Sequence, residues 1–327
     1  MSTANIGQVA VIPAIQKSNF GTVEVLASRD IEKARQVAQA LGIGRVVGSY
    51  EALLKDPDVD AVYIPLPNTM HAEWTIRAAE AGKAVLCEKP LATSAEDVAK
   101  QIEACAKHGV SLMEAFMYRF HPQTRRVREL ITSGAIGQVK EVRAHLSVNI
   151  MRTFDRSNIR YADRLGGGAL LDMGCYTVNI CRMIFGREPG RVIGRLQIDP
   201  NLRVDTSAAG ILEFDGGIGM ITCWFGADGQ GAYTIVGTEG TIEVPRGIIL
   251  GLGTRVPEGL IVVMDADGKR REEIFEPGDH YRDMVDAFSG ALLNGQPVPL
   301  SPEDSLKNMK VLEALARSSA KDSSESV

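Results

Sequence analysis

Short apolar runs alternate with amphipathic stretches in the first third of this sequence, and this alternation constrains the fold more than any other feature. The apolar runs have the length of buried strands and lie at residues 23–27, 46–47, 61–64, 84–87 and 111–114. The stretches between them have helical spacing, as at 31–41, where Asp30 can cap the start and Gly42 can end the helix. Strands that alternate with helices form βαβ units, so the pattern predicts a doubly wound parallel sheet of the α/β class.

The pattern changes after Pro122. Helices are expected at 124–133 and 170–185, and a half-exposed strand at 138–150. Six strand candidates then follow with turn signals between them, at 190–198, 205–214, 217–225, 232–236, 241–244 and 260–265. Strands without intervening helices indicate a large, mainly antiparallel sheet. Two helices and a frayed polar tail complete the chain, at 280–293, 302–318 and 319–327. We therefore expect an α/β domain at 1–120 and an α+β domain at 121–327.

Charge and apolar content exclude several classes of protein. The 36 basic and 41 acidic residues are well mixed and give a net charge of −5, so no basic face favours nucleic acid. No apolar run approaches the ~18 residues of a membrane span, and no signal peptide opens the chain. Five cysteines, without a C-x-x-C pair, fit reduced cytoplasmic thiols, and the five histidines lack metal-ligand spacing. We expect a cytoplasmic protein that binds no membrane, nucleic acid or metal.

The loops after the predicted parallel strands are the places to look for a ligand, because open parallel sheets bind ligands at the carboxyl ends of their strands. Ser28 and Arg29 follow the first apolar run. A hydroxyl and a guanidinium both suit phosphate, and an arginine in this loop accommodates the 2′-phosphate that distinguishes NADP from NAD. The alternative is a surface arginine that precedes a helix.

Polar side chains also follow the next two long apolar runs. Asn68 and His71 come after the first of them, and Glu88, Lys89 and Pro90 after the second. Asn68 can simply cap a helix, His71 can be satisfied inside it, and Lys89 can be a solvated surface group. The functional alternative is a cation positioned at Lys89 by the turn that Pro90 makes rigid.

A run of three glycines at 166–168 precedes a predicted helix that carries Asp172 and Tyr176. Glycines allow a backbone to approach a ligand or another chain closely. Residues four apart lie on one helix face, so the carboxylate and the phenol form a candidate pair for binding a hydroxyl and transferring its proton. The alternative is an aspartate that the helix dipole stabilises and a tyrosine that packs in the core.

Taken together, the motifs resemble the Gfo/Idh/MocA family of NAD(P)-dependent oxidoreductases over nearly the whole chain. They occur in the family's order as ASRD, PLPNTMH, LCEKPLA, MEAFMYRFHP, GGGALLDMGCY, YRDMVDAF and SPEDSLKNMKVLEAL. The resemblance implies a Rossmann-like dinucleotide-binding domain, followed by a domain that binds substrate and often forms oligomers. It also implies hydride transfer between a nicotinamide and a sugar, polyol or related alcohol. The strand-rich second half favours a homodimer or homotetramer through the sheet face.

The resemblance assigns the catalytic roles. Lys89 matches the lysine that contacts substrate and nicotinamide ribose, and Asp172 matches the substrate-binding acid. Tyr176 stands where many members have histidine, as in the subgroup of glucose–fructose oxidoreductase, xylose dehydrogenase and dimeric dihydrodiol dehydrogenase, and is the implied acid/base. Loop position and resemblance together predict NADP, less so NAD, and contacts from Gly7, Ser28, Arg29, Asn68, His71, Glu88, Lys89, Pro90 and Arg119.

The start of the chain departs from the family pattern. Members begin with an apolar strand that leads into G-x-G-x-x-G, whereas here Ser2 and Ala4 replace the first two glycines and only Gly7 remains. The first strand is missing, and it would be central in the sheet. A different start or a shortened chain, a strand supplied by rearrangement or by a partner subunit, and a truncated relative are three open explanations.

Two functional hypotheses from different classes follow. The first is an NADP-dependent dehydrogenase or reductase of sugars, polyols or trans-diols, with Tyr176 as acid/base and a nearby Lys89 ammonium favouring the phenolate. The alternative is a truncated, cofactor-impaired homologue that acts as a ligand-binding or regulatory protein. A hydrolase ranks last, because the sequence has neither a G-x-S-x-G elbow nor an H-E-x-x-H motif.

Overall fold

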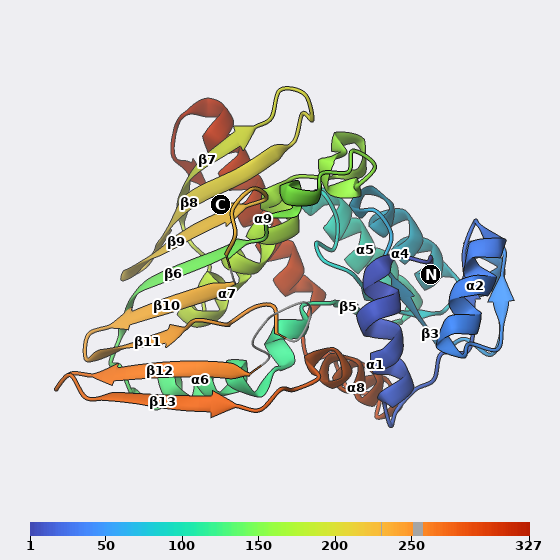
Figure 1. Ribbon diagram of the computed structural model, residues 1–327, viewed down its shortest axis with the longest axis horizontal. Coiled ribbons are helices and arrows are strands. Elements are labelled where there is room, and N and C mark those ends of the chain that lie inside the picture. Colours follow the sequence, from blue (N-terminus) through green and yellow to red (C-terminus); the bar gives the residue numbers. More distant parts are fainter. Residues whose placement is uncertain (230, 251–257) are drawn as a thin grey trace. The chain divides into compact units, whose positions relative to one another are not determined.

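The computed structural model describes residues 1–229, 231–250 and 258–327 of the chain (Figure 1). The chain divides into two compact units. The first unit comprises Met1–Met117 with Asp279–Leu306, and the second comprises Tyr118–Gly278 with Lys307–Val327. The sequence placed a boundary between residues 120 and 121 and gave everything after it to the second domain. The structure instead returns Asp279–Leu306 to the first unit.

The first unit contains the predicted parallel strands, in two separate sheets. β3 (Ala61–Ile64), β4 (Ala84–Cys87) and β5 (Leu112–Glu114) form a parallel sheet in the order β3-β4-β5. A parallel pair stands apart from it and consists of β1 (Leu26–Ala27) and β2 (Val46–Val47). The Rossmann-like class is confirmed.

The helices of the first unit begin and end at the expected signals. They are α2 (Ile31–Leu41), α3 (Tyr50–Leu54), α4 (His71–Glu80), α5 (Ala95–His108) and α8 (His280–Leu293). The Asp30 side chain accepts a hydrogen bond from the Lys33 amide, and Gly42 ends α2 in the left-handed conformation. Only Leu26–Ala27 of the predicted strand 23–27 is regular; around it, the Leu26 amide donates to the Arg45 carbonyl and the Ser28 amide donates to the Val47 carbonyl.

The N-terminal helical stretch contains a π-helical segment. This segment (Gly7–Val11) leads into α1 (Ile12–Lys17), with Pro13 in the first turn of α1. Proline has no amide to donate and disturbs the preceding turn, and a π segment accommodates such a defect. The disturbance at Pro13 therefore takes the form of a change of helix type that lies before the proline.

Helix α8 joins the first unit by packing against α1. Lys17 forms an ion pair of 3.3 Å with Asp279, and the Ser18 hydroxyl donates a hydrogen bond of 2.5 Å to Asp286. The buried face of α8 includes Met284, Val285 and Phe288. The amphipathic pattern of α8 predicts a buried face but not which sheet it covers, and for this reason the sequence assigned α8 to the wrong domain.

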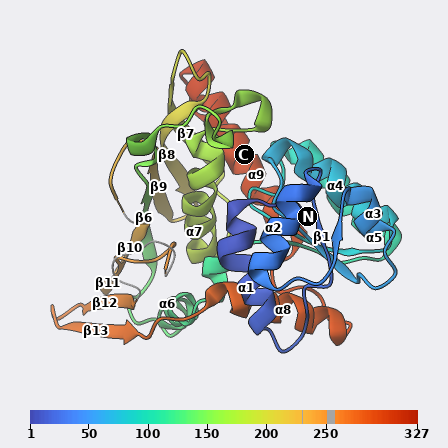
Figure 2. The ribbon, with the colours of Figure 1, turned by 45° about the vertical axis from the view of Figure 1, so that its right-hand side comes forward.

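The second unit is built on a nine-stranded sheet with the order β13-β12-β11-β10-β6-β9-β8-β7-β14 (Figure 2). Its strands are β6 (Val139–Ser147), β7 (Arg191–Ile198), β8 (Asp205–Phe214), β9 (Gly217–Trp224), β10 (Ala232–Gly237), β11 (Gly240–Val244), β12 (Gly259–Asp265), β13 (Arg270–Phe275) and β14 (Glu325–Ser326). Neighbours are antiparallel except β6 and β9. The large, mainly antiparallel sheet is confirmed.

Two strands were missed. β13 has the sequence RREEIF, whose charged residues conceal a strand. The tail was expected to fray, yet Glu325 pairs with Val192 of β7 and forms ion pairs with Arg317 and Lys321. These ion pairs with the preceding helix hold the edge strand in place, although its sequence lacks an apolar pattern.

Helices cover one face of the nine-stranded sheet. α7 (Cys175–Phe185) packs on β6 and β9, and α9 (Pro302–Lys321) contributes to this unit from Lys307 onward. A Cβ on Gly194 would lie 2.2 Å from the Leu315 backbone oxygen, so glycine permits this close approach. The unit also contains α6 (Pro122–Thr132) and short 3₁₀ segments. Among the described residues, no helix has both the length and the apolar character needed to cross a bilayer.

Candidate active site

The carboxyl ends of β3 and β4 hold the loop that carries Lys89. The Glu88 amide donates to the Ile64 carbonyl at 3.1 Å, and the Tyr63 hydroxyl donates to the Glu88 carboxylate at 2.6 Å. The same carboxylate accepts from the Lys89 amide at 3.3 Å. Burial and the Glu88 charge raise the pKa of Tyr63 well above its ordinary value, so this phenol stays a donor. The Glu88 side chain thus holds the backbone of Lys89 in place.

The β5 end holds the same loop from the other side. The Glu114 carboxylate accepts a hydrogen bond of 2.9 Å from the Leu91 amide, and the Leu91 carbonyl accepts one of 3.1 Å from Gln101. Glu114 and Gln101 are both buried. Sequence reasoning missed these two residues, although a buried glutamate at a strand end was a signal in the motif that contains Glu114.

His71 links two loops of the first unit. Its side chain is fully buried, with Nδ1 2.9 Å from the Pro90 carbonyl oxygen and Nε2 2.8 Å from the Leu66 carbonyl oxygen. Burial lowers the pKa of His71, and the two carbonyls offset this effect only in part. The structure therefore gives His71 a positioning role between the loops after β3 and β4, next to the predicted contacts Asn68 and Pro90.

Ser28 and Arg29 differ in their surroundings. Ser28 is buried, and its hydroxyl accepts a hydrogen bond of 3.1 Å from the Asp30 amide at the start of α2. Arg29 is exposed and hydrogen-bonds to the Tyr50 side chain, where its charge opposes the burial that raises the pKa of that phenol. An exposed guanidinium at the carboxyl end of β1 is available to an anion.

The turn before the N-terminal helix retains part of a glycine motif. Ser2 has a φ of 67°, a left-handed conformation that usually requires glycine. A Cβ on Gly7 would lie 3.7 Å from Tyr63 and 3.8 Å from Pro65, which is ordinary contact. Gly7 is buried, and the packing around it leaves room for a Cβ at ordinary contact distance.

In the second unit, Asp172 is paired with a residue that the sequence did not single out. The Nε of Arg160 lies 2.7 Å from Oδ2 of Asp172. This carboxylate raises the pKa of the Arg160 guanidinium, and Tyr176 is also within electrostatic reach of it. Arg160 thus brings a positive charge to both predicted catalytic residues of this unit.

Tyr176 lies in a buried aromatic and polar cluster. Its ring meets that of Tyr118 edge-on, with the centroids 5.9 Å apart. The Asn179 side-chain oxygen accepts hydrogen bonds from the Tyr118 hydroxyl at 2.6 Å and from Arg119 at 3.0 Å. Asn179 comes one helical turn after Tyr176, a spacing that could have identified it.

The glycine run serves the protein's own backbone. A Cβ on Gly167 would lie 2.4 Å from the Arg160 carbonyl oxygen, and one on Gly168 would lie 2.1 Å from the Asp205 carboxylate. Gly168 also has a φ of 117°, where side chains are strained. These two glycines let the loop fold back and carry Arg160 to Asp172. The close approach to a ligand or another chain stays a prediction.

Asp205 holds the start of the helical stretch that carries Asp172. Its carboxylate accepts a hydrogen bond of 2.6 Å from the Leu170 amide, at the beginning of the π segment Leu170–Gly174 that precedes α7. Burial raises the pKa of Asp205 to about 6. Within the described part of the chain, no group of histidine, cysteine and acidic side chains is arranged to hold a metal ion.

Two family profiles match this chain. The one described as "Oxidoreductase family, NAD-binding Rossmann fold" matches residues 3–116, and the one described as "GFO/IDH/MocA C-terminal domain" matches residues 124–243. Together they span the loops, the glycine run and the tyrosine described above.

Curated relatives are similar over most of the chain. D-xylose 1-dehydrogenase (NADP(+)) 2 of Haloferax volcanii is 39% identical, over 97% of this chain and 95% of its own length. Trans-1,2-dihydrobenzene-1,2-diol dehydrogenase of Xenopus tropicalis is 36% identical, over 72% of this chain and 70% of its own.

Solved structures share the fold. A 3-ketoreductase from Actinomadura kijaniata, in complex with NADP and TDP-benzene, has a TM-score of 0.89 and 28% identity, and the match covers 96% of this chain and 95% of that one. An aldose-aldose oxidoreductase from Caulobacter crescentus, complexed with glycerol, has a TM-score of 0.90 and 26% identity over 99% and 97%.

Proposed function

Because the chain belongs to the Gfo/Idh/MocA family of oxidoreductases, we propose that it transfers hydride between NADP and a hydroxyl-bearing carbon of a sugar, polyol or trans-diol. The observation that carries this proposal is the placement of Arg160 beside Asp172 and Tyr176 in the second unit. A carboxylate can hold a substrate hydroxyl, and a phenol can move its proton. The similar xylose and dihydrodiol dehydrogenases and the aldose-aldose oxidoreductase support the substrate class.

The first unit supplies groups that suit a dinucleotide. The exposed Arg29 and the Ser28 loop suit the 2′-phosphate that distinguishes NADP, and a xylose dehydrogenase relative and a ketoreductase relative are named with that cofactor. Gly7, the glycine that remains of the motif, is assigned by that motif to the dinucleotide as well. Further contacts are assigned by motif to Asn68, His71, Glu88, Lys89, Pro90 and Arg119. When bound, the nicotinamide ring accepts or supplies the hydride.

Tyr176 acts as the acid/base. In the oxidative direction, its phenolate takes the proton of the substrate hydroxyl while the carbon loses hydride and becomes a carbonyl; the reverse direction returns both. A cation favours the phenolate, and Arg160 adds one to the Lys89 ammonium that the motif supplies. Asp172 orients the hydroxyl, and Arg160 limits the freedom of that carboxylate. The buried cluster of Tyr118 and Asn179 backs the phenol ring.

We also propose that the protein works in the cytoplasm as a homodimer or homotetramer. All five cysteines are buried free thiols, which suits a reducing compartment. On the uncovered face of the nine-stranded sheet, the strand register places the exposed side chains of Ile211, Ile218, Trp224 and Met264. Exposed apolar side chains on one sheet face suit an interaction surface.

The alternative of a cofactor-impaired regulatory homologue has less support, because the relatives reported above are named as dehydrogenases, reductases and oxidoreductases. Calorimetric titration with NADP⁺ and separately with NAD⁺ tests the choice. Saturable binding that is tighter for NADP⁺, followed by nicotinamide absorbance change with an aldose or diol, is the expected result. A folded protein that binds neither nucleotide would refute the proposal.

A further inference from the structure

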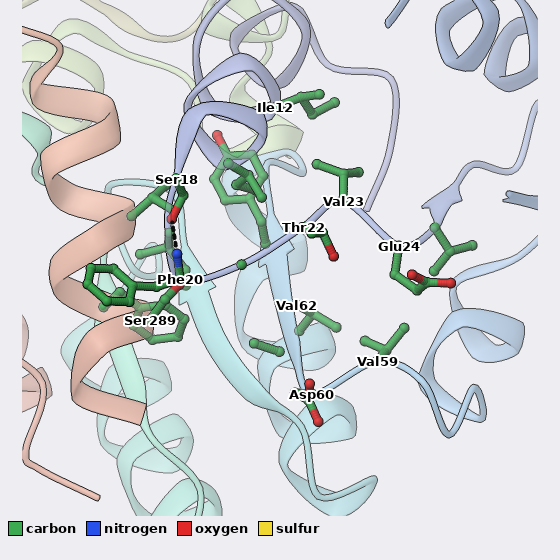
Figure 3. Close-up of a pocket in the computed structure, with 18 of the residues that line it drawn as sticks. Ile12, Ser18, Phe20, Thr22, Val23, Glu24, Val59, Asp60, Val62 and Ser289 are labelled. Carbon is green, nitrogen blue, oxygen red and sulfur yellow. Dashed lines mark hydrogen bonds between the residues drawn. The ribbon is translucent and has the colours of Figure 1, made fainter. Parts of the chain in front are cut away.

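The pocket that Figure 3 shows belongs to the first unit. It has a volume of about 690 Å³, and the residues that line it, among them Val23, Val59 and Val62, all come from that unit. Asp172 and Tyr176 are not among them. The second unit fixes these two residues through buried contacts of its own.

Asp172 and Tyr176 lie in two different kinds of helix. Asp172 is the third residue of the π segment Leu170–Gly174, and Tyr176 is the second residue of α7. The π segment packs against β8 and β9. Single π turns are rare and occur frequently at functional sites. The position of Asp172 therefore depends on what holds the start of this π segment.

Asp205, the first residue of β8, holds that start. Its buried carboxylate accepts a hydrogen bond of 2.6 Å from the Leu170 amide and another from the Ala169 amide. Burial raises the pKa of Asp205 to about 6, and the groups that act against this shift are backbone amides. Above that pH the carboxylate is charged, and a charged acceptor holds an amide more strongly than a neutral acceptor does.

Gly168 connects this contact to Asp172. A Cβ on Gly168 would lie 2.1 Å from Oδ1 of Asp205, so a glycine is needed for the chain to pass this close to the carboxylate. The Gly168 carbonyl in turn accepts a hydrogen bond of 3.1 Å from the Asp172 amide. The backbone of Asp172 is thus one hydrogen bond away from the residue that lies on Asp205.

Cys223 of β9 holds the same start from the neighbouring strand. Its buried thiol donates a hydrogen bond of 3.4 Å to the Ala169 carbonyl. Burial raises the pKa of the Cys223 thiol above its ordinary value, so the thiol remains a donor. A Cβ on Gly174 would lie 3.5 Å from this sulfur and 2.8 Å from Cδ1 of Leu170, so the glycine lets the end of the π segment pack closely as well. Both ends of the segment therefore lie near one side chain of β9.

Different residues hold the side chain and the backbone of Asp172. The Nε of Arg160 lies 2.7 Å from its carboxylate. Asp205 and Cys223 instead hold the residues at which its π segment begins. Tyr176 lies beyond that segment, in α7. Loosening the start of the π segment should therefore displace Asp172 more than Tyr176.

We propose that Asp205 and Cys223 are positioning residues for the reaction: they fix the start of the π segment, so that Asp172 meets the substrate hydroxyl in the productive orientation. The inference rests on the proposed function, because it needs Asp172 to bind that hydroxyl. Neither residue takes part in the transfer of the proton or the hydride. A misplacement of about 1 Å at a reacting group can cost roughly 10²-fold in rate, so an anchor of this kind influences turnover.

Steady-state kinetics above pH 7, where the Asp205 carboxylate is charged, test this role with the aldose or diol on which the parent is most active. We expect Asp205→Ala to lower kcat/KM roughly tenfold to hundredfold, mainly through a higher KM, with NADP⁺ affinity unchanged. Asp205→Asn keeps one acceptor oxygen and should recover most of this loss.

Cys223→Ala should lower kcat/KM in the same sense by roughly threefold to tenfold, because it removes one hydrogen bond to the start of the segment. Cys181→Ala is the matched control. It removes an equally buried thiol, on α7, that faces Gly219 of β9. It should leave both kcat and KM unchanged.

Amide exchange measures the anchor without any turnover. We expect Asp205→Ala to speed exchange at the Leu170 and Asp172 amides by at least about tenfold, and Cys181→Ala to leave both unchanged. Unchanged exchange in Asp205→Ala would refute the anchor itself.

The two measurements separate this inference from the proposed function. A parent that turns over no aldose or diol would refute the proposed function, and with it a role in catalysis, while faster exchange would still show the anchor. If the parent is active, an Asp205→Ala enzyme with a lower folded fraction but the KM of the parent would show a structural role only and overturn the inference. Should Asp205→Ala fail to fold, equal KM values in Cys223→Ala and Cys181→Ala would overturn it.

Discussion

The Nε of Arg160 donates a hydrogen bond of 2.7 Å to Oδ2 of Asp172 across a glycine loop that brings the two residues together. The side chain of Asp172 is largely buried, with 16% of its surface exposed, whereas Arg160 is 42% exposed. The carboxylate is thus held by a partner that still reaches the surface. This pairing fixes the orientation of the residue that we propose binds the substrate hydroxyl.

Replacing this arginine should therefore impair turnover. We expect Arg160→Gln to lower kcat/KM roughly tenfold to hundredfold, because a partly buried carboxylate loses its charged partner. We also expect the limb of the pH profile where kcat/KM for oxidation rises with pH to move to higher pH, since the Tyr176 phenolate loses a nearby cation. The measurement is steady-state kinetics from pH 6 to 10 with the substrate found by the absorbance screen.

Arg156→Gln is the matched control, because Arg156 is an exposed arginine of the same segment. It should leave both kcat/KM and the pH profile unchanged. A purely structural role for Arg160 would lower the amount of folded enzyme but leave the position of the rising limb in place, and that outcome would contradict the proposed role.

Removing the phenol of Tyr176 tests the acid/base assignment. We expect Tyr176→Phe to lower kcat by about 10²–10⁴-fold, with NADP⁺ affinity within about threefold of the parent, because the ring keeps its contact with Tyr118. Tyr233→Phe removes the hydroxyl of another fully buried tyrosine in the same unit and should retain activity. Full turnover by Tyr176→Phe would exclude this residue as the acid/base.

Most of the fold could be predicted from the sequence. Apolar runs and helix signals predicted the parallel strands, α2 and the antiparallel sheet, and the motifs identified the family that the profiles confirm. Local patterns fail where distant segments decide the structure. The charged β13 and the short β14 are strands because neighbouring strands pair with them, and α8 belongs to the first unit because α1 packs against it.

The candidate site likewise contains residues that local patterns predict and residues that only the folded chain brings together. Spacing and motif identified Asp172 and Tyr176 as candidates. Arg160 is twelve residues away from Asp172 and reaches it only through the loop at 160–168. The glycines of that loop were interpreted as a ligand approach because a sequence does not show which atoms a missing Cβ would meet. Here those atoms are the Arg160 carbonyl and the Asp205 carboxylate.

Cofactor preference should depend on Arg29. We expect Arg29→Ala to weaken NADP⁺ binding roughly tenfold to hundredfold and to leave NAD⁺ binding within twofold, because only NADP⁺ carries the 2′-phosphate that the guanidinium suits. Calorimetric titration measures both affinities. Arg35→Ala is the control, since Arg35 is exposed on α2 and pairs with Glu32. Unchanged NADP⁺ affinity in Arg29→Ala would exclude this contact.

A side chain at Gly168 should disrupt the loop. Gly168→Ala places a Cβ 2.1 Å from the Asp205 carboxylate at a φ of 117°, so we expect a loss of roughly 2–4 kcal/mol in the free energy of unfolding. Gly44→Ala is the comparison, because a Cβ on Gly44 would meet no atom within 4 Å. Urea denaturation measures both variants, and equal effects would show that the contact with Asp205 does not constrain the loop.

Asp205 should make stability depend on pH in a definite direction. Its pKa is about 6 in the folded protein against 3.8 ordinarily, because burial disfavours the charge. Between pH 4 and 6 the folded state binds more protons than the unfolded state, so stability falls as pH rises, by up to roughly 3 kcal/mol. The Met1 amine, with its pKa lowered to about 5, acts in the opposite direction between about pH 5 and 8 and is present in both proteins that we compare. Asp205→Asn keeps an acceptor for the Leu170 amide but cannot titrate. Urea denaturation at pH 4, 5, 6 and 7 should therefore show a more positive slope of unfolding free energy against pH for the variant than for the parent. Identical slopes would refute the assignment.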